Sequence, residues 1–293
     1  MLRGIFSAMI TPFDRSENID EKGVETLIKW AIGKGINGVF VAGSTGESWA
    51  LSFEEKVRLF NLAVSAAEKR LQVIAGVGVP STREAIQLAE AAQAAGVDYL
   101  CAVPPSFVKP TQDELIAHYS VLAQATSVPM ILYNIPMLAG NVLGTAAVRM
   151  LAEGFSQIVG IKDSSGDLTL LNDLIWQRRE NFSVLTGIDT LVLPGLFAGS
   201  QGAILGSANF CPDLALEIMK FFDAGRYQEA WAVQNRLTQC WIATGLGTFP
   251  SAVKAGVELL GLPAGPPRRP VAPLESDKLE VLQRELRTIG VVE

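Results

Sequence analysis

The sequence predicts an α/β fold, a (β/α)8 TIM barrel with a C-terminal helical extension, from three observations. Short apolar runs recur eight times between residues 5 and 205, with helix-like segments between them. Seven of the eight runs are almost continuously apolar, which is typical of parallel strands covered by helices. No dinucleotide-binding fingerprint follows any run, and this disfavours the runner-up fold, a doubly wound open sheet.

The eight apolar runs are the predicted strands. Their length, four to six residues, is that of buried strands rather than of helices. In chain order they are Ile5–Ile10, Gly38–Ala42, Gln72–Val77, Tyr99–Val103, Pro129–Tyr133, Gln157–Lys162, Ser183–Thr186 and Gly202–Leu205.

Capping residues mark the helices between these runs. Ser52, Ser81 and Thr111 each stand three residues before a glutamate, which is the spacing of a capping box at a helix start. Gly35 and Gly96 occupy positions typical of helix C-caps. The pattern therefore predicts a helix after each of several strands, as a barrel requires.

Strand signals stop after Leu205, and the rest of the chain is helical in pattern. Helices are expected within about 213–262 and 274–288, interrupted by a segment rich in glycine and proline at 261–267. No flexible linker precedes this part. We therefore expect a barrel core at 1–210, whose last helix runs into the next segment, and at 211–293 a helical extension packed on the barrel.

Composition excludes several classes of function. A net charge of −6 and a pI near 5.1 argue against nucleic-acid or anionic-membrane partners. Cys101, Cys211 and Cys240 are too few and too scattered for a disulfide framework or a zinc site, which fits a reducing cytoplasm. The single histidine, His118, disfavours a zinc or iron hydrolase. Neither a signal peptide nor an apolar run of transmembrane length is recognisable, so we expect a cytoplasmic protein.

Lys162 closes the sixth apolar run and is followed by turn-forming residues. A lysine in this position either leans into solvent at the barrel rim or is desolvated in the mouth of the barrel. A desolvated amine gives up its proton more readily, as a Schiff-base nucleophile must. Rim lysines are the more common case, so Lys162 alone does not decide between the two.

The second run ends in the loop Gly43–Glu47, which has the sequence GSTGE. Such a loop can simply turn the chain. It can also bind an anion, because its glycines allow close backbone approach and the Ser44 and Thr45 hydroxyls can face a carboxylate or phosphate. In a barrel this loop lies at the carboxyl ends of the strands, where active sites are found.

Two more strand ends carry candidate groups. Tyr133 ends the fifth run; a tyrosine there usually packs in the core or at the rim, but its hydroxyl can also transfer protons at an atom reacting near Lys162. The eighth run is followed by Gly206, and its backbone could contact an anion or merely allow tight packing, which is the more common explanation.

Taken together, these motifs resemble the dihydrodipicolinate synthase / N-acetylneuraminate lyase family of class I, pyruvate-dependent aldolases. The resemblance extends from Gly4–Phe13 to the closing helices and includes Lys109–Thr111, Gly160–Asp163 and the glycines of the eighth run. It implies a homotetramer that needs no cofactor and no metal, and that binds pyruvate and an aldehyde.

The resemblance also implies roles for individual residues. Lys162 would form a Schiff base with pyruvate, and Tyr133 would relay protons at the imine and at the C–C bond. Ser44 and Thr45 would bind the keto-acid carboxylate, and Ile204 would lie against the pyruvyl group.

The chain departs from the synthases of this family at positions that narrow the range of expected substrates. Leu138 stands where synthases carry an arginine for the carboxylate of aspartate semialdehyde. Phe107 occupies the segment in which synthases pass a second tyrosine across a dimer interface, and it has no hydroxyl. Both residues are candidates for substrate contact. The positions for feedback lysine read Phe53, Lys56 and Ser106, so lysine inhibition is not expected.

The sequence therefore predicts a Schiff-base lyase that cleaves or condenses a 2-keto acid, such as a 2-keto-3-deoxy sugar acid or a sialic-acid-like substrate. One alternative is 4-hydroxy-tetrahydrodipicolinate synthase, which condenses pyruvate with aspartate semialdehyde. Another is a catalytically silent barrel that binds keto acids. The main reason for it is that Phe107 has no hydroxyl.

Overall fold

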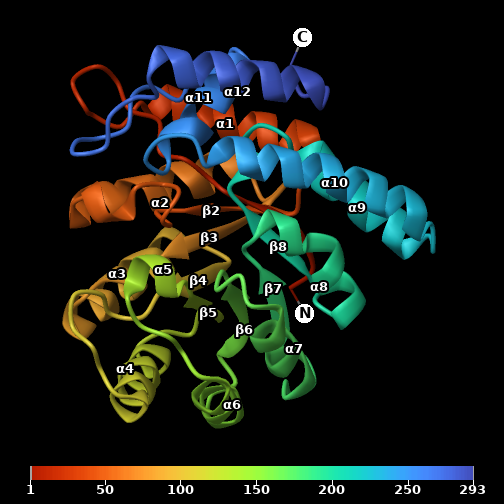
Figure 1. Cartoon of the computed structure of the whole chain (residues 1–293). Coiled ribbons are helices and arrows are strands. Elements are labelled where there is room, and N and C mark those ends of the chain that lie inside the picture. The colour runs from red at the N-terminus through yellow and green to blue at the C-terminus, as the bar shows by residue number, and fades with distance from the viewer. Residues whose placement is uncertain (1, 293) are drawn as a thin grey trace.

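The computed structural model describes residues 2–292, and its centre is a closed barrel of eight parallel strands (Figure 1). The order around the barrel is the order along the chain, so the predicted (β/α)8 fold is confirmed. All eight predicted strands are present, with ends that differ by at most two residues. They are β1 (Gly4–Ala8), β2 (Gly38–Val41), β3 (Gln72–Gly76), β4 (Tyr99–Ala102), β5 (Met130–Asn134), β6 (Ile158–Asp163), β7 (Ser183–Thr186) and β8 (Gly202–Leu205).

Helices cover the outside of this barrel. Gly35 and Gly96 end two of them in the left-handed conformation, as predicted. The helices between strands are α1 (Glu21–Lys34), α2 (Phe53–Ala67), α3 (Thr82–Ala95), α4 (Gln112–Gln124), α5 (Pro136–Ala139), α6 (Thr145–Gly154), α7 (Leu168–Trp176) and α8 (Val192–Ala198). Short 3-10 turns are η1 (Ser48–Ala50), η2 (Asp189–Leu191) and η3 (Ser207–Asn209).

Two of the three predicted capping boxes form. Ser52 and Thr111 each accept a hydrogen bond from the third helical N–H, and the glutamate there bonds back to the cap. The capping box predicted at Ser81 is wrong. Ser81 has φ −99° and ψ 123°, whereas the two working caps have ψ near 165–170°, and its side chain makes no cap hydrogen bond. The neighbouring hydroxyl of Thr82 lies 2.8 Å from Nδ1 of His118 instead.

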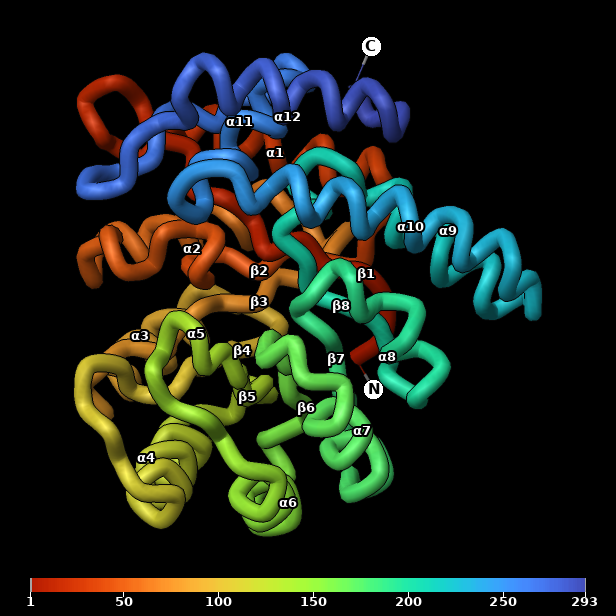
Figure 2. The backbone as a smooth tube through the Cα atoms, viewed as in Figure 1, coloured from red at the N-terminus to blue at the C-terminus, as the bar shows by residue number. Residues whose placement is uncertain are grey.

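The C-terminal helices are α9 (Pro212–Asp223), α10 (Tyr227–Thr244), α11 (Ser251–Leu259) and α12 (Ser276–Thr288). In the tube view they lie on the side of the barrel that carries α1 and α2, opposite α4 and α6 (Figure 2). Because α9 is the first α-helix after β8, with only the 3-10 turn η3 between them, it takes the place of the eighth barrel helix. The division at residue 210 stays a prediction.

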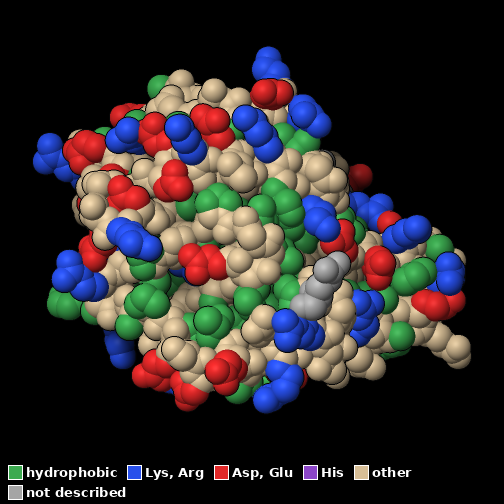
Figure 3. Space-filling model, turned by 90° about the horizontal axis from the view of Figure 1, so that it is seen from above, with side chains coloured by type: hydrophobic (Ala, Val, Ile, Leu, Met, Phe, Trp, Pro, Cys, Tyr) green, Lys and Arg blue, Asp and Glu red, His purple; other side chains and the backbone are tan. Residues whose placement is uncertain are grey.

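The surface carries charges of both signs. On the face seen from above, acidic and basic side chains are interspersed rather than segregated (Figure 3). Within residues 2–292, no helix has the combination of length and apolarity needed to cross a membrane.

The barrel closes where β1 pairs with β8, and this seam is tight. Gly4 lies opposite Gly202, and both have positive φ, 121° and 144°. A Cβ on Gly202 would lie 2.0 Å from the carbonyl oxygen of Gly4, so only glycine fits there. Asn209 secures the seam from the β8 side, donating to the Ala8 carbonyl at 2.7 Å and accepting from Ile10 N at 2.9 Å.

The core has two layers because side chains alternate along each strand. In β5, Met130 and Leu132 face the helices, whereas Ile131 and Tyr133 face the barrel interior. The interior layer contains Leu2, Phe6, Ala8, Phe40, Ile74, Cys101, Ile131, Tyr133, Leu185 and Ile204. This alternation places the Tyr133 side chain inside the barrel, at the carboxyl end of its strand.

Candidate active site

Strand register brings Lys162 and Tyr133 together. The two residues are direct partners in the β5–β6 ladder, and partners on neighbouring parallel strands point to the same face of a sheet. Lys162 Nζ donates a hydrogen bond to the Tyr133 hydroxyl at 3.0 Å. Lys162 is only 2% exposed, so the predicted desolvated position, rather than the rim position, is the one found.

The surroundings of the Lys162 amine are mostly aromatic and apolar. Nζ lies 4.1 Å from the ring centre of Tyr133 and 5.1 Å from that of Phe40. Phe40 and Tyr133 pack edge to face with ring centres 6.0 Å apart. Rings in this position favour a cation over their faces but offer few hydrogen bonds, so the Tyr133 hydroxyl is an important polar partner of the amine.

A second buried charge lies near Lys162 and was not predicted from the sequence. Burial raises the pKa of Asp189 to about 6, while Ser207 and Lys162 act in the opposite direction. Asp189 Oδ1 accepts a hydrogen bond from the Ser207 hydroxyl, and Oδ2 has no hydrogen-bond partner within residues 2–292. Its only sequence signal was an acidic residue shortly after the seventh strand, at the edge where active sites lie.

The loop after β2 meets Tyr133 from the other side of the barrel. Ser44 Oγ lies 3.1 Å from the Tyr133 hydroxyl, so three polar groups form a row: the Lys162 amine, the Tyr133 phenol and the Ser44 hydroxyl. Thr45 is adjacent and buried, with 3% of its surface exposed. The structure therefore brings together Lys162, Tyr133 and Ser44, as the sequence predicts.

A cavity of about 740 Å³ adjoins this row, with Ser44 and Tyr133 but not Lys162 among its lining residues. Leu138 forms part of its wall while remaining half exposed. Among the described residues that line the cavity, Lys56 is the one cation and Glu84 the one acidic group. Burial lowers the pKa of Lys56, and the charge of Glu84 opposes this shift.

Three of the residues expected to contact substrate, Thr45, Phe107 and Ile204, are absent from the cavity lining. Phe107 is fully exposed, has the left-handed φ of 74°, and is absent from the cavity lining, where its neighbour Ser106 is found. Within this single chain Phe107 does not reach the site. Ile204 is fully buried in the interior layer that also holds Tyr133, and it is absent from the cavity lining as well.

A buried polar pair, not predicted from the sequence, fixes the ends of β5 and β6. Asn134 donates to Asp163 Oδ1 at 2.8 Å and accepts a hydrogen bond from Leu143 N at 3.1 Å. Burial raises the pKa of Asp163, and hydrogen bonds from Asn134 and Ser165 oppose that rise. Because Asn134 and Asp163 directly follow Tyr133 and Lys162, the pair holds the two candidate catalytic side chains in register.

Fold and site together define a class of protein, a barrel lyase of the class I aldolase type, in which a lysine amine forms an imine with a carbonyl substrate. No group of three or more His, Cys, Asp or Glu side chains within residues 2–292 could hold a metal ion. The chain belongs to the dihydrodipicolinate synthetase family, whose sequence model matches residues 1–289. The family consists of pyruvate-dependent lyases.

Relatives of known name share most of their length with this chain. A protein of Methanopyrus kandleri named 4-hydroxy-tetrahydrodipicolinate synthase is 37% identical over 99% of this chain and 97% of its own length. A protein of Methanoculleus marisnigri with the same name is 37% identical over 99% of this chain and 100% of its own length.

Solved structures of this family superpose on the chain over nearly its whole length. YagE, a prophage protein of the dihydrodipicolinic acid synthase family from E. coli solved in complex with pyruvate, superposes with a TM-score of 0.97 at 30% identity, over 99% of each chain. Dihydrodipicolinate synthase from Aquifex aeolicus superposes with a TM-score of 0.95 at 30% identity, over 99% of each chain.

Proposed function

We propose that Lys162 attacks the keto carbon of pyruvate and forms an imine there. The amine nitrogen adds to the carbon, the carbonyl oxygen leaves as water, and a C=N bond replaces the C=O bond. The imine nitrogen then withdraws electrons, so that a proton leaves the methyl carbon and an enamine forms. The observation that carries this proposal is the buried contact between Lys162 Nζ and the Tyr133 hydroxyl.

Tyr133 is positioned to move protons in these steps. Its hydroxyl contacts both the amine, at 3.0 Å, and Ser44 Oγ, at 3.1 Å. A hydroxyl within hydrogen-bond reach of the reacting nitrogen can act as a relay: it passes its own proton to the departing carbonyl oxygen and accepts the proton that the nitrogen releases, so that the phenol ends neutral and the oxygen leaves as water. Ser44 lines the cavity together with Tyr133, and its hydroxyl can donate to the pyruvate carboxylate, with Thr45 supporting the loop.

Two candidate reactions differ in the substrate that joins or leaves pyruvate. The names of relatives at 32–37% identity support condensation with aspartate semialdehyde, the reaction of 4-hydroxy-tetrahydrodipicolinate synthase, more than the sugar-acid lyase predicted first. We propose the synthase reaction as the principal function on this basis.

One observation favours the second candidate, a lyase for a 2-keto-3-deoxy sugar acid. Leu138 lines the cavity, and a leucine cannot hold a carboxylate as a guanidinium group can. A neutral hydroxylated chain would leave no charge without a partner beside Leu138.

Borohydride trapping tests the shared first step. Reduction of the imine gives a stable secondary amine, so pyruvate and borohydride together are expected to add mass to the peptide that contains Lys162. The matched control is Lys162→Met, which keeps the length of the side chain and lacks the amine. An active enzyme with its adduct on another lysine, or with none, contradicts the proposal.

The two candidate functions are separated by direct comparison. The values of kcat/KM for condensation of pyruvate with aspartate semialdehyde, and for cleavage of 2-keto-3-deoxy sugar acids and sialic acid, are measured on the same preparation. The synthase proposal expects the first value to be the largest, and a larger value for a cleavage reaction selects the second candidate. Imine formation without turnover on any substrate indicates a silent keto-acid-binding barrel.

A further inference from the structure

Glu47, the last residue of the loop that carries Ser44, is bound by the C-terminal extension. Its side chain is fully buried. Oε1 lies 2.7 Å from Nζ of Lys254 in α11, and Oε2 accepts a hydrogen bond of 2.8 Å from the backbone N–H of Arg268. No other hydrogen bond reaches Oε1 within residues 2–292, so the lysine is the partner of that oxygen.

Lys254 is almost as deeply buried as Glu47, with 2% of its surface exposed. Its ammonium group also donates to the Pro266 carbonyl at 2.9 Å and lies 4.3 Å from the ring centre of Phe13. Burial lowers the pKa of Lys254, and the Glu47 carboxylate opposes this shift. Each of the two buried charges therefore depends on the other, because a lone buried charge is strongly unfavourable.

Hydrogen bonds within the loop couple the position of Glu47 to that of Ser44. Glu47 N donates to the Ser44 carbonyl at 3.2 Å, and Ser48 N donates to the Gly43 carbonyl at 3.1 Å. Thr11 Oγ1 donates to the Gly46 carbonyl at 2.6 Å. Glu47 itself has the left-handed φ of 55°, an unfavourable conformation for a residue with a side chain, which persists only where neighbouring contacts hold it.

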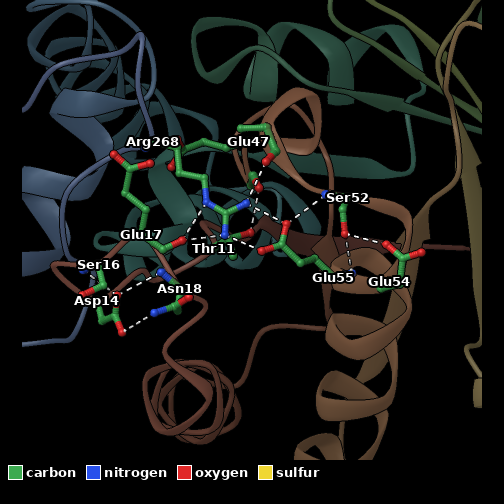
Figure 4. A network of polar contacts seen from close by, with 12 residues as sticks. Thr11, Asp14, Ser16, Glu17, Asn18, Glu47, Ser52, Glu54, Glu55 and Arg268 are labelled. Atoms are coloured by element: carbon green, nitrogen blue, oxygen red, sulfur yellow. Dashed lines mark hydrogen bonds and ion pairs between the residues drawn. The ribbon is translucent and has the colours of Figure 1, made fainter.

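Arg268 presents its backbone N–H to Glu47 because its side chain is fixed from several directions (Figure 4). The guanidinium group is bidentate to Glu55 of α2 and donates to the Glu17 carbonyl at 2.6 and 2.9 Å. It also lies 4.3 Å from the ring centre of Phe13. These side-chain contacts fix Arg268 against the barrel, and so hold its backbone N–H where Glu47 Oε2 accepts it.

We infer that Glu47 and Lys254 are positioning residues: through their ion pair the C-terminal extension holds the Ser44 loop in the conformation that binds the carboxylate of the keto acid. This inference rests on the proposed function, in which that loop binds pyruvate. Neither residue touches substrate. The extension is therefore part of the binding site although its helices lie outside the barrel.

The test compares variants by their KM for pyruvate and by kcat. Lys254→Met removes the charge and keeps most of the volume, and Lys254→Arg restores a cation. Lys278→Met is the matched control, because Lys278 belongs to the same extension but pairs with Glu275 at the surface. A merely destabilised enzyme contains fewer active molecules, which lowers kcat and leaves KM unchanged, whereas a displaced loop raises KM.

Lys254→Met is expected to raise the KM for pyruvate about 10- to 100-fold, the scale of an ångström-sized displacement of a binding group. Lys254→Arg is expected to recover part of this loss, and Lys278→Met to keep the wild-type KM. If Lys254→Met fails to fold, the double variant Glu47→Gln/Lys254→Met, which leaves no buried charge at this pair, is measured in its place.

A folded Lys254→Met or double variant with the wild-type KM for pyruvate overturns the inference. Borohydride trapping on the wild-type enzyme separates this failure from that of the proposed function. If wild type forms the Lys162 adduct and the variants keep their KM, only the positioning role is wrong. If wild type forms no adduct, the proposed function is wrong and the inference falls with it.

Discussion

Replacing Tyr133 by phenylalanine removes a single oxygen atom from the centre of the site. The ring is 3% exposed and packs on Phe40, and a phenylalanine ring can keep that packing. The contacts that disappear are the hydrogen bond from Lys162 and the 3.1 Å contact with Ser44. The variant is therefore expected to fold, with its defect confined to the row of polar groups.

The size of the defect follows from what the oxygen does. A positioned acid or base contributes about 10²- to 10⁴-fold to turnover, which is about 3–5 kcal/mol in activation free energy. Loss of a buried hydrogen-bond partner for the Lys162 amine costs about 1–3 kcal/mol in the free energy of unfolding. The two effects are separable, because the first appears in kcat and the second in thermal melting.

The assay is kcat for pyruvate consumption, with the melting temperature measured on the same samples. Tyr119→Phe is the matched control. Its hydroxyl is fully buried and donates to the Ala102 carbonyl at 3.1 Å, but it lies outside the row of polar groups. Tyr119→Phe is expected to melt at a lower temperature and to keep its kcat. A Tyr133→Phe enzyme with near-wild-type kcat would mean that another group or water carries the proton.

Two further predictions concern specificity and pH. Leu138→Arg is expected to raise kcat/KM for aspartate semialdehyde, because an arginine on the cavity wall can grip both oxygens of its carboxylate; an unchanged or lower value contradicts the interpretation of Leu138. Burial raises the pKa of Asp189 from 3.8 to about 6, so the folded state keeps a proton that the unfolded chain releases, and stability falls as pH rises from about 4 to 6, by about 3 kcal/mol. Asp189→Asn is expected to lack this slope, so that the difference in melting temperature between wild type and variant changes between about pH 4 and 6, and parallel pH curves would refute the assignment.

The sequence predicts the barrel and the centre of the site for the same reason. Strand period and strand ends are local properties, and apolar runs with turn residues between them report both. Once the strands are placed, Tyr133 and Lys162 end neighbouring strands, and parallel pairing brings their side chains to one face. Their proximity can therefore be predicted from the order of the strands alone.

What the sequence does not predict depends on contacts between distant segments or on loop conformation. Glu47 and Lys254 meet only because the extension folds back on the barrel. The direction of Phe107 follows from a single positive φ in a loop, which no periodicity reports. The homotetramer implied by the family resemblance stays a prediction.

The contact between two of the cysteines is likewise not predictable from the sequence. Cys211 and Cys240 are scattered in the sequence, yet the packing of α9 against α10 brings their sulfur atoms to 3.0 Å. Both thiols are free and buried. Spacing along the chain carries no information on this contact, because it depends on how two helices of the extension cross.

The seam between β1 and β8 decides when the barrel can be completed. The hydrogen bond from Ile10 N to Asn209 joins residues 199 positions apart, whereas the bond from Ile5 N to Asn37, near the start of β2, spans 32. Closing the longer loop costs only about 1.6 kcal/mol more in chain entropy. The larger consequence concerns synthesis. A ribosome must release β8 before it can pair with β1, and until then the edge of β1 and the edge of the last strand released stay unpaired. During translation the seam is therefore the place where one nascent chain is open to pairing with another.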